Sequence, residues 1–328
     1  MQDLLIQKFL RVTEVAAIAS YAWVGKNDKH AADDAATEAM RNAFHSIEFD
    51  GTVVIGEGER DEAPMLFIGE KLGTGKGPKI DIAVDPLDGT NLAATGADNA
   101  VCVLAAAPEH SLFHAPDTYM EKIAVGPKIG NVVSLSKSVE ENLDAIAKKT
   151  GKKMSEITVV VLERPRHDDI VKRVKAKGAN VKFIQEGDVF GAIITAFDQT
   201  LTSGQKNDVN IGQTEFVHAD ILMGVGAAPE GVIAATALKI LGGYFEGRLK
   251  PRDDADKARA IKMGAKVDKI YTIDELVKGN DLVFVATGVT NGYLMNGVKK
   301  QGDTFITNSM YVDSKTKSAR FIETKYKV

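Results

Sequence analysis

Cysteine is almost absent from this chain: Cys102 is the only one among 328 residues. A single cysteine excludes an intramolecular disulfide and a metal site built from several thiolates. Cys102 lies in the apolar run AVCVLAAA, which favours a small buried side chain over a reactive thiol. The fold must therefore rest on a hydrophobic core, and a chain of this length can bury roughly three quarters of its unfolded surface.

Long apolar runs and a surplus of basic charge are also missing. No stretch of 18 apolar residues occurs, so we expect no membrane-spanning helix. The N-terminus shows charged residues at helical spacing and no signal-peptide pattern, which favours a cytoplasmic protein. Lys and Arg number 41 against 45 Asp and Glu, a net charge of −4. This balance argues against a general nucleic-acid-binding role, so we expect neither nucleic acid nor membrane as a partner.

Apolar strand-like runs alternate with longer helical patterns, which is typical of an α/β or α+β fold. Helices are predicted at 2–22 and 31–46, and strands at 52–58, 79–85, 99–107 and 121–126. We place a soft domain boundary near residue 150, between an α+β half at 1–150 and an α/β half at 151–328. The two halves could also form one compact unit. The polar stretch 199–216 is interpreted as a surface insertion.

The string DPLDGT, residues 85–90, carries the strongest local signal. An apolar strand reaches Asp85, Pro86 is expected to end it, and Asp88 follows three residues later. Two neighbouring carboxylates suit Mg²⁺ or Mn²⁺, which prefer hard oxygen ligands. Gly89 and Thr90 can open a helix whose N–H groups bind phosphate. The alternative is an ordinary acidic turn, because Asp-Pro and Asp-Gly are common turn sequences.

Further acids stand at strand ends and helix starts. Glu57 and Asp61 stand where the strand at 52–58 ends, and a cation would relieve the repulsion among acids gathered there. Asp33 lies near a helix start, and Glu230 follows a Gly-rich loop and a proline. Helix capping explains these last two equally well. The acids could nevertheless converge on one site with more than one metal ion.

Basic and polar groups follow two later strands. Arg164 and Arg166, with Pro165 between them, are suited to a phosphate group, although a solvated surface pair is the alternative. The run 186–188, Glu-Gly-Asp, follows the next strand, and Asp188 is expected to open a helix and to suit sugar hydroxyls. In an α/β sheet the loops at the carboxyl ends of strands line the ligand crevice.

Together with Glu57, DPLDGT resembles the lithium-sensitive, metal-dependent phosphatase superfamily of inositol monophosphatases and fructose bisphosphatases. Collinear strings narrow the resemblance to the class II, GlpX-type fructose-1,6-bisphosphatases: GTVVIGEGERDEAPML, DIAVDPLDGT, YMEKIAVGP, RPRHDDI, GDV, GAAPEG and ATGVTNG. The resemblance runs from about residue 10 to 325. It implies a layered α-β-α-β-α sandwich of the inositol monophosphatase/fructose bisphosphatase type.

The resemblance also implies an activity: hydrolysis of the 1-phosphate of fructose 1,6-bisphosphate, a gluconeogenic step, with Mn²⁺ or Mg²⁺. Metal ligands implied by it are Asp33 and Glu57 for one ion and Asp85, Asp88 and Glu230 for the other. Lys29, Asp61 and Thr90 match the groups around the attacking water. Substrate contacts implied by it are Asp88, Gly89, Thr90, Tyr119, Arg164, Pro165, Arg166, Glu186, Gly187, Asp188 and Ala227.

Two departures from the family pattern stand out. The 199–216 stretch is longer than expected, and Ala227 replaces the second glycine of Gly-Gly-Ala-Pro-Glu-Gly, where a Cβ could crowd the phosphate or be tolerated. Other substrates stay open, namely sedoheptulose 1,7-bisphosphate or an inositol phosphate. So does a non-catalytic role as a sugar-phosphate-binding regulator. The resemblance favours a homodimer or a homotetramer.

Overall fold

The computed structural model describes residues 1, 3–58, 65–197 and 219–327. The chain forms two compact units: Met1–Leu112 and Gly279–Val328 belong to the first, and Phe113–Gln199 and Val217–Lys278 to the second. The boundary expected near residue 150 falls inside the second unit, because the chain crosses at residue 113 and returns at 279. The predicted insertion at 199–216 lies outside the described residues.

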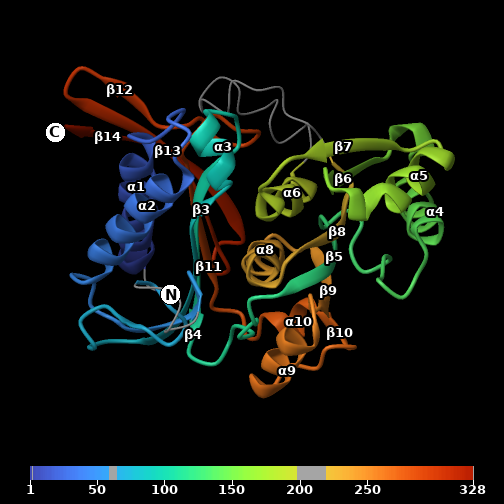
Figure 1. The fold of residues 1–328 in the computed structure, drawn as a ribbon, viewed down its shortest axis with the longest axis horizontal. Helices are drawn as coiled ribbons and strands as arrows, with labels where there is room; N and C mark the ends of the chain where they lie inside the picture. The colour runs from blue at the N-terminus through green and yellow to red at the C-terminus, as the bar shows by residue number, and fades with distance from the viewer. Residues whose placement is uncertain (2, 59–64, 198–218, 328) are drawn as a thin grey trace. The chain divides into compact units, whose positions relative to one another are not determined.

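A mixed sheet of eight strands forms the centre of the first unit, in the order β12-β13-β11-β4-β3-β1-β2 with β14 on β13 (Figure 1). β1 and β3 are parallel, and β4 runs antiparallel to β3. The strands are β1 (Asp50–Ile55), β2 (Lys71–Leu72), β3 (Lys79–Asp88), β4 (Val101–Pro108), β11 (Val283–Gly288), β12 (Lys299–Gln301), β13 (Thr304–Asp313) and β14 (Ser318–Lys327).

Helices α1 (Asp3–Tyr21) and α2 (Lys29–Phe44) pack together on one face of this sheet, and α3 (Thr90–Thr95) follows β3. Side chains alternate across a strand, so Ile80, Ile82 and Val84 of β3 join the core under α1 and α2. Phe9, Phe44 and Phe49 pack edge-on or tilted at its centre. The same alternation places Asp81 and Asp85 on the opposite face of β3.

The second unit contains a six-stranded mixed sheet in the order β10-β9-β5-β8-β6-β7. β5 is antiparallel to β8 and β9, whereas β6 is parallel to β7 and β8. The strands are β5 (Tyr119–Val125), β6 (Thr158–Leu162), β7 (Asn180–Ile184), β8 (Ile221–Ala227), β9 (Tyr244–Lys250) and β10 (Ile270–Thr272).

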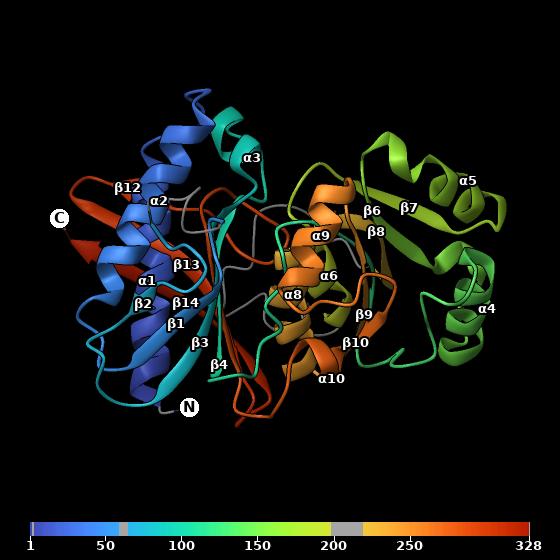
Figure 2. The ribbon, with the colours of Figure 1, turned by 60° about the horizontal axis from the view of Figure 1, so that its bottom comes forward.

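Helices cover both faces of this second sheet. Side chains of α4 and α5 share a core with β5, β6 and β8, whereas α6 and α8 pack together on the other face (Figures 1 and 2). The helices are α4 (Val139–Thr150), α5 (Asp168–Ala176), α6 (Asp188–Ile193), α8 (Ala228–Ile240), α9 (Asp254–Lys262) and α10 (Ile273–Leu276), with 3₁₀ turns η1 (Met154–Glu156), η2 (Pro165–His167) and η3 (Ile194–Ala196). The layered α+β fold expected from the sequence is confirmed.

One local prediction, at a helix cap, is confirmed, and another, at a strand end, is wrong. The spacing of Ser138 and Glu141 predicts a capping box at the start of a helix, and the two residues form it at α4. Pro86 does not end β3, so that expectation was wrong: the strand continues to Asp88 through an irregular register between Asp85 and Asp88. Such a bulge admits a residue that cannot donate a ladder hydrogen bond.

Three further expectations concern a helix cap, membrane helices and the single cysteine. Gly187, and not Asp188, is the N-cap of α6, because the Asp188 carboxylate is bonded to Lys122 and makes no cap bond. Within the described ranges, no helix has the length and hydrophobicity that crossing a bilayer requires. Cys102 is fully buried, as predicted.

Candidate active site

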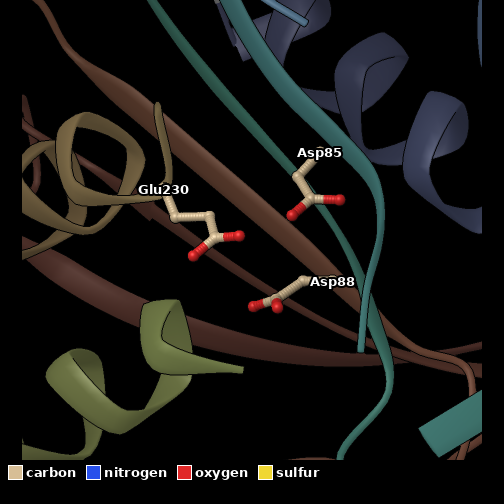
Figure 3. Close-up of side chains that lie close together, drawn as sticks. All are labelled: Asp85, Asp88 and Glu230. Atoms are coloured by element: carbon tan, nitrogen blue, oxygen red, sulfur yellow. The ribbon is translucent and has the colours of Figure 1, made fainter. Parts of the chain in front are cut away.

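Asp85 and Asp88 lie where β3 ends in the first unit (Figure 3). The Leu87 N–H donates to Asp85 Oδ1 at 3.1 Å, an Asx turn that fixes this carboxylate. Asp88 is buried, with 4% of its surface exposed. Each aspartate offers a carboxylate oxygen within 4.8 Å of the other. The spacing read from the sequence therefore does bring these two carboxylates together.

Gly89 and Thr90 connect this strand end to helix α3. Gly89 is the N-cap and has φ +89°, in the left-handed region that favours glycine. A Cβ there would also lie 3.0 Å from Leu92 Cδ1. Thr90 is the first residue of the helix and is half-buried. The turn thus places the Thr90 hydroxyl-bearing side chain two residues from Asp88.

Asp33 and Glu57 add two more carboxylates to the same unit. Asp33 lies in the second turn of α2, and Glu57 follows β1, where its N–H donates to Leu66 O at 3.0 Å. Burial, and then the charge of Asp34, raise the pKa of Asp33 to about 6. Burial, and then the charges of Asp33, Asp85 and Asp34, raise the pKa of Glu57 to about 9. These acids therefore repel one another in a partly desolvated position.

Hard oxygen donors crowded in this way fit a divalent cation. A cation would offset the repulsion that raises both pKa values, and carboxylates are ligands that Mg²⁺ and Mn²⁺ prefer. Lys29 is the first residue of α2 and is exposed. Asp61, the expected proton acceptor, lies outside the described residues.

Tyr119, Arg166 and Ala227 come together at one end of the sheet in the second unit. Tyr119 pairs directly with Ala227 across β5 and β8. The Arg166 guanidinium lies 5.0 Å from the centre of the Tyr119 ring, and its Nε and Nη2 donate to Val225 O at 3.1 and 2.7 Å. Those two bonds engage two of the five N–H donors of the guanidinium. The arrangement fixes Arg166 while leaving donors with which it could bind an anion.

His167 holds the arginine-bearing loop in place. Its Nε2 accepts from the Val225 N–H at 2.8 Å and its Nδ1 lies 2.7 Å from Leu162 O, so Nδ1 carries the proton. Burial, aided by the charges of neighbouring arginines, lowers the pKa of His167. Pro165 stands at the start of the η2 turn, and Arg164 donates from Nη1 to Glu163 O at 2.8 Å. The loop therefore carries both predicted arginines, and His167 ties it to β8.

The run 186–188 lies between β7 and α6. Gly187 has φ +82°, and its left-handed conformation turns the chain so that Asp188 points inward. Asp188 Oδ2 accepts from Lys122 Nζ at 2.6 Å, and both side chains are buried. Glu230 lies in the first turn of α8, where Figure 3 labels it, 3.9 Å from the same Nζ. Glu186 is half-buried.

Lys122 is a residue that sequence reasoning missed. The signal was present, because a lysine stands inside the predicted strand 121–126, directly before the apolar residues 123–125. A lysine at an inward-facing strand position is rare unless it is paired. Its partner could not be identified from the sequence, because Asp188 is 66 positions away.

Comparison with known proteins places the chain in a family. The sequence model of one protein family, the bacterial fructose-1,6-bisphosphatases encoded by glpX, matches residues 3–326 of this chain. A fructose-1,6-bisphosphatase class 2 from Haemophilus influenzae is 41% identical, over 98% of this chain and 96% of that protein. A D-fructose 1,6-bisphosphatase class 2/sedoheptulose 1,7-bisphosphatase from Prochlorococcus marinus is 43% identical, over 99% and 96%.

Among solved structures, the extragenic suppressor protein suhB from Bartonella henselae matches 60% of this chain and 75% of its own. This likeness is distant, with 11% identity and a TM-score of 0.35. The match to the family model, in contrast, covers almost every residue, and so do the two relatives. This chain therefore belongs to the family of bacterial, glpX-encoded fructose-1,6-bisphosphatases.

Proposed function

We propose that this protein hydrolyses the 1-phosphate of D-fructose 1,6-bisphosphate, giving fructose 6-phosphate and phosphate. The observation that carries the proposal is the group of mutually repelling carboxylates around the end of β3, in a chain that belongs to a family of sugar bisphosphatases. A non-catalytic sugar-phosphate binder would have no need of such a group. The reaction is a step of gluconeogenesis.

We assign Mn²⁺ or Mg²⁺ to the site. Asp33 and Glu57 would hold one ion, and Asp85, Asp88 and Glu230 a second. When bound, such ions lower the pKa of a coordinated water and offset charge on the phosphoryl oxygens. The support within the first unit is the raised pKa of Asp33 and Glu57, since it is the ionised form of both that a cation would stabilise.

The chain's own groups would position the reactants. Phosphoryl transfer proceeds through a loose transition state, so positioning and charge dominate the rate. Thr90, presented at the start of α3, would donate a hydrogen bond to the attacking water or the bridging oxygen. Lys29 would offset negative charge, and Asp61 would accept the proton. Backbone N–H groups at Gly89 and Thr90 would hold the reacting phosphate.

The second unit would bind the rest of the substrate. The fixed guanidinium of Arg166, stacked on Tyr119, is suited to the phosphate at the other end of the sugar. Arg164 and Pro165 belong to the same loop. Glu186, Gly187 and Asp188 would contact sugar hydroxyls, and Ala227, which pairs with Tyr119, would border the substrate.

A seven-carbon substrate is the second candidate. The relative from Prochlorococcus marinus carries both bisphosphatase names. Paired arginines suit either bisphosphate, because they recognise the phosphate and not the length of the sugar. An inositol monophosphate is less suited, because it leaves the arginine loop without a second phosphate.

Phosphate release by the purified protein tests the proposal. The substrates are fructose 1,6-bisphosphate, sedoheptulose 1,7-bisphosphate and an inositol monophosphate, each with Mn²⁺, with Mg²⁺ and with a chelator. We expect the highest kcat/KM for fructose 1,6-bisphosphate and no release in the chelator. Release from no member of the panel would refute the proposal and favour the binding-protein alternative.

We further propose a cytoplasmic homodimer or homotetramer. The support is the family membership of the chain. Light scattering of the purified protein measures the assembly directly, and a monomer at micromolar concentration would refute this part.

A further inference from the structure

Lys122 is one of the most deeply buried charged residues in the second unit, with 2% of its surface exposed. It lies in the middle of β5, and its Nζ contacts two carboxylates from two different helices. Asp188 Oδ2, at the start of α6, is 2.6 Å away, and Glu230 Oε2, in the first turn of α8, is 3.9 Å away. One ammonium therefore lies between a proposed sugar contact and a proposed metal ligand.

The backbone around Lys122 leaves space for this arrangement. A Cβ on Gly226 would lie 1.9 Å from Asp188 Oδ2 and 3.1 Å from Lys122 Nζ. A Cβ on Gly231 would lie 3.3 Å from Lys122 Cε. Any residue other than glycine at position 226 would displace the pair. Two glycines, on β8 and α8, thus make room for the ion pair.

In the part of the chain that the structure describes, the protein supplies a hydrogen-bond donor to only one of the two carboxylate oxygens of Asp188. Asp188 Oδ2 accepts a hydrogen bond from Lys122 Nζ. Asp188 Oδ1 is buried and has no hydrogen-bond partner among the described residues. A buried carboxylate oxygen without a donor is costly, so such an atom calls for an explanation. A hydroxyl group of a bound sugar would supply the missing donor. Lys122 fixes one oxygen of Asp188 and leaves the other for the ligand.

We propose that Lys122 is a positioning residue that links sugar binding to metal binding. It holds Asp188 in place, and its charge lies between Asp188 and Glu230. At the same time its charge opposes a cation near Glu230, so it moderates metal affinity. The proposal rests on the proposed function, because Asp188 and Glu230 take their roles from it.

Lys122→Met tests the link, because methionine keeps the length and removes the charge. Without its partner the Asp188 carboxylate is unpaired and no longer held in place, so KM for fructose 1,6-bisphosphate should rise by roughly tenfold or more. With the opposing ammonium gone, Mn²⁺ should bind the substrate-free protein about threefold or more tightly, as measured by calorimetry. A variant with only a structural defect would bind both fructose 1,6-bisphosphate and Mn²⁺ more weakly. Weaker substrate binding together with tighter Mn²⁺ binding would therefore identify the proposed role.

Lys152→Met is the matched control. Lys152 also donates at 2.6 Å to a buried aspartate of the same unit, Asp220, which is assigned no role in the site. We expect KM and Mn²⁺ affinity within about twofold of wild type, and a loss of stability comparable to that of Lys122→Met. If Lys152→Met reproduced the opposite shifts, the assignment to Lys122 would be overturned.

A double variant, Lys122→Met/Asp188→Asn, covers the case in which the single variant does not fold. It removes both buried charges, so Mn²⁺ affinity should return to within about twofold of wild type while KM stays raised. Mn²⁺ affinity unchanged or weakened in Lys122→Met, or KM within twofold of wild type, would overturn the proposal. If the wild type released no phosphate, the proposed function would fail, whereas the calorimetry would still test the electrostatic link.

Discussion

Glu57 of the first unit and Asp256 of the second lie in opposite electrostatic environments. In the first unit, burial and the charges of Asp33 and Asp85 raise the pKa of Glu57. In the second unit, burial would also raise the pKa of Asp256. There, hydrogen bonds from Arg252, Thr118 and Arg259 outweigh burial and hold this pKa well below its usual range.

The difference separates structural acids from functional ones. A buried carboxylate that receives donors from its own chain needs nothing from solution. A carboxylate that faces other carboxylates keeps its negative charge only when a cation is added. Asp33, Glu57 and Asp85 therefore mark a binding site, whereas Asp256 ties α9 to the segment before β5.

Asp85→Ala should give the largest effect, because it removes a carboxylate from the repelling group. We expect kcat/KM with Mn²⁺ to fall on the order of a thousandfold, several kcal/mol of transition-state stabilisation. Phosphate release measures it. Glu109→Ala, which removes a surface acid 3.6 Å from Lys79, should stay within about twofold of wild type. Hydrolysis by Asp85→Ala that needs no metal would contradict the metal assignment.

Thr90→Ala comes next, and it tests whether the turn after β3 does chemistry or only shapes the site. Loss of one hydrogen-bond donor to the reacting group should lower kcat about a hundredfold and change KM little. Thr95→Ala is the matched control on the same helix, where the Thr95 hydroxyl donates to Asn91 O and Leu92 O. Near-normal turnover in Thr90→Ala would refute the role.

Without metal, the protein should become less stable as pH rises, because the pKa values of Asp33 and Glu57 are raised in the folded state. Because the folded pKa values of Asp33 and Glu57 exceed the unfolded ones, their contribution is fully present below about pH 4. It is lost as pH rises through about 6 and then about 9. In a chelator the free energy of unfolding should fall by roughly 5 kcal/mol from pH 5 to pH 8, most of it from Glu57.

Urea titrations at both pH values measure this loss, and Mn²⁺ should remove it because the ion binds the ionised carboxylates. Asp33→Asn should also reduce the loss, since it removes one repelling charge. A metal-free protein whose stability did not change between pH 5 and pH 8 would show that the acids are not crowded as described.

The contribution of Asp256 to stability should depend on pH in the opposite direction, which sharpens the contrast between Asp256 and Glu57. Its folded pKa is lowered, so its contribution is present above the unfolded value and is lost as pH falls toward the folded one. Between pH 5 and pH 3 the wild type should lose on the order of 1 kcal/mol more than Asp256→Asn. Equal losses in the two proteins, measured in urea, would contradict the pairing with Arg252 and Arg259.

The sequence predicted those parts of the site that depend on neighbouring residues. The closeness of the Asp85 and Asp88 carboxylates and the capping box at Ser138 depend on short-range patterns, and the structure contains both. The passage of β3 through Pro86 was not predictable in this way. It depends on β4, which sets the irregular register.

Contacts between residues far apart in the chain could not be predicted from the sequence. The first unit is completed by residues from 279 onward, and no composition change marks either crossing. Likewise, Asp188 looked like a helix cap, because Asp is a common cap residue. Only the fold brings Lys122 to it, and the ion pair then takes the carboxylate away from the helix N-terminus.

Ala227→Gly should have the smallest effect, and it tests whether a departure from the family pattern matters. Ala227 has φ −71° and ψ 142°, an extended conformation that any residue adopts, so the backbone does not require glycine. We expect kcat and KM for fructose 1,6-bisphosphate within about twofold of wild type, and slightly lower stability from the added freedom of the unfolded chain. A KM several-fold lower in Ala227→Gly would show instead that the Cβ, beside Tyr119 across the strand pair, crowds the substrate. The affinity of the second unit would then be limited by this methyl group, and the arginine loop alone would not account for it.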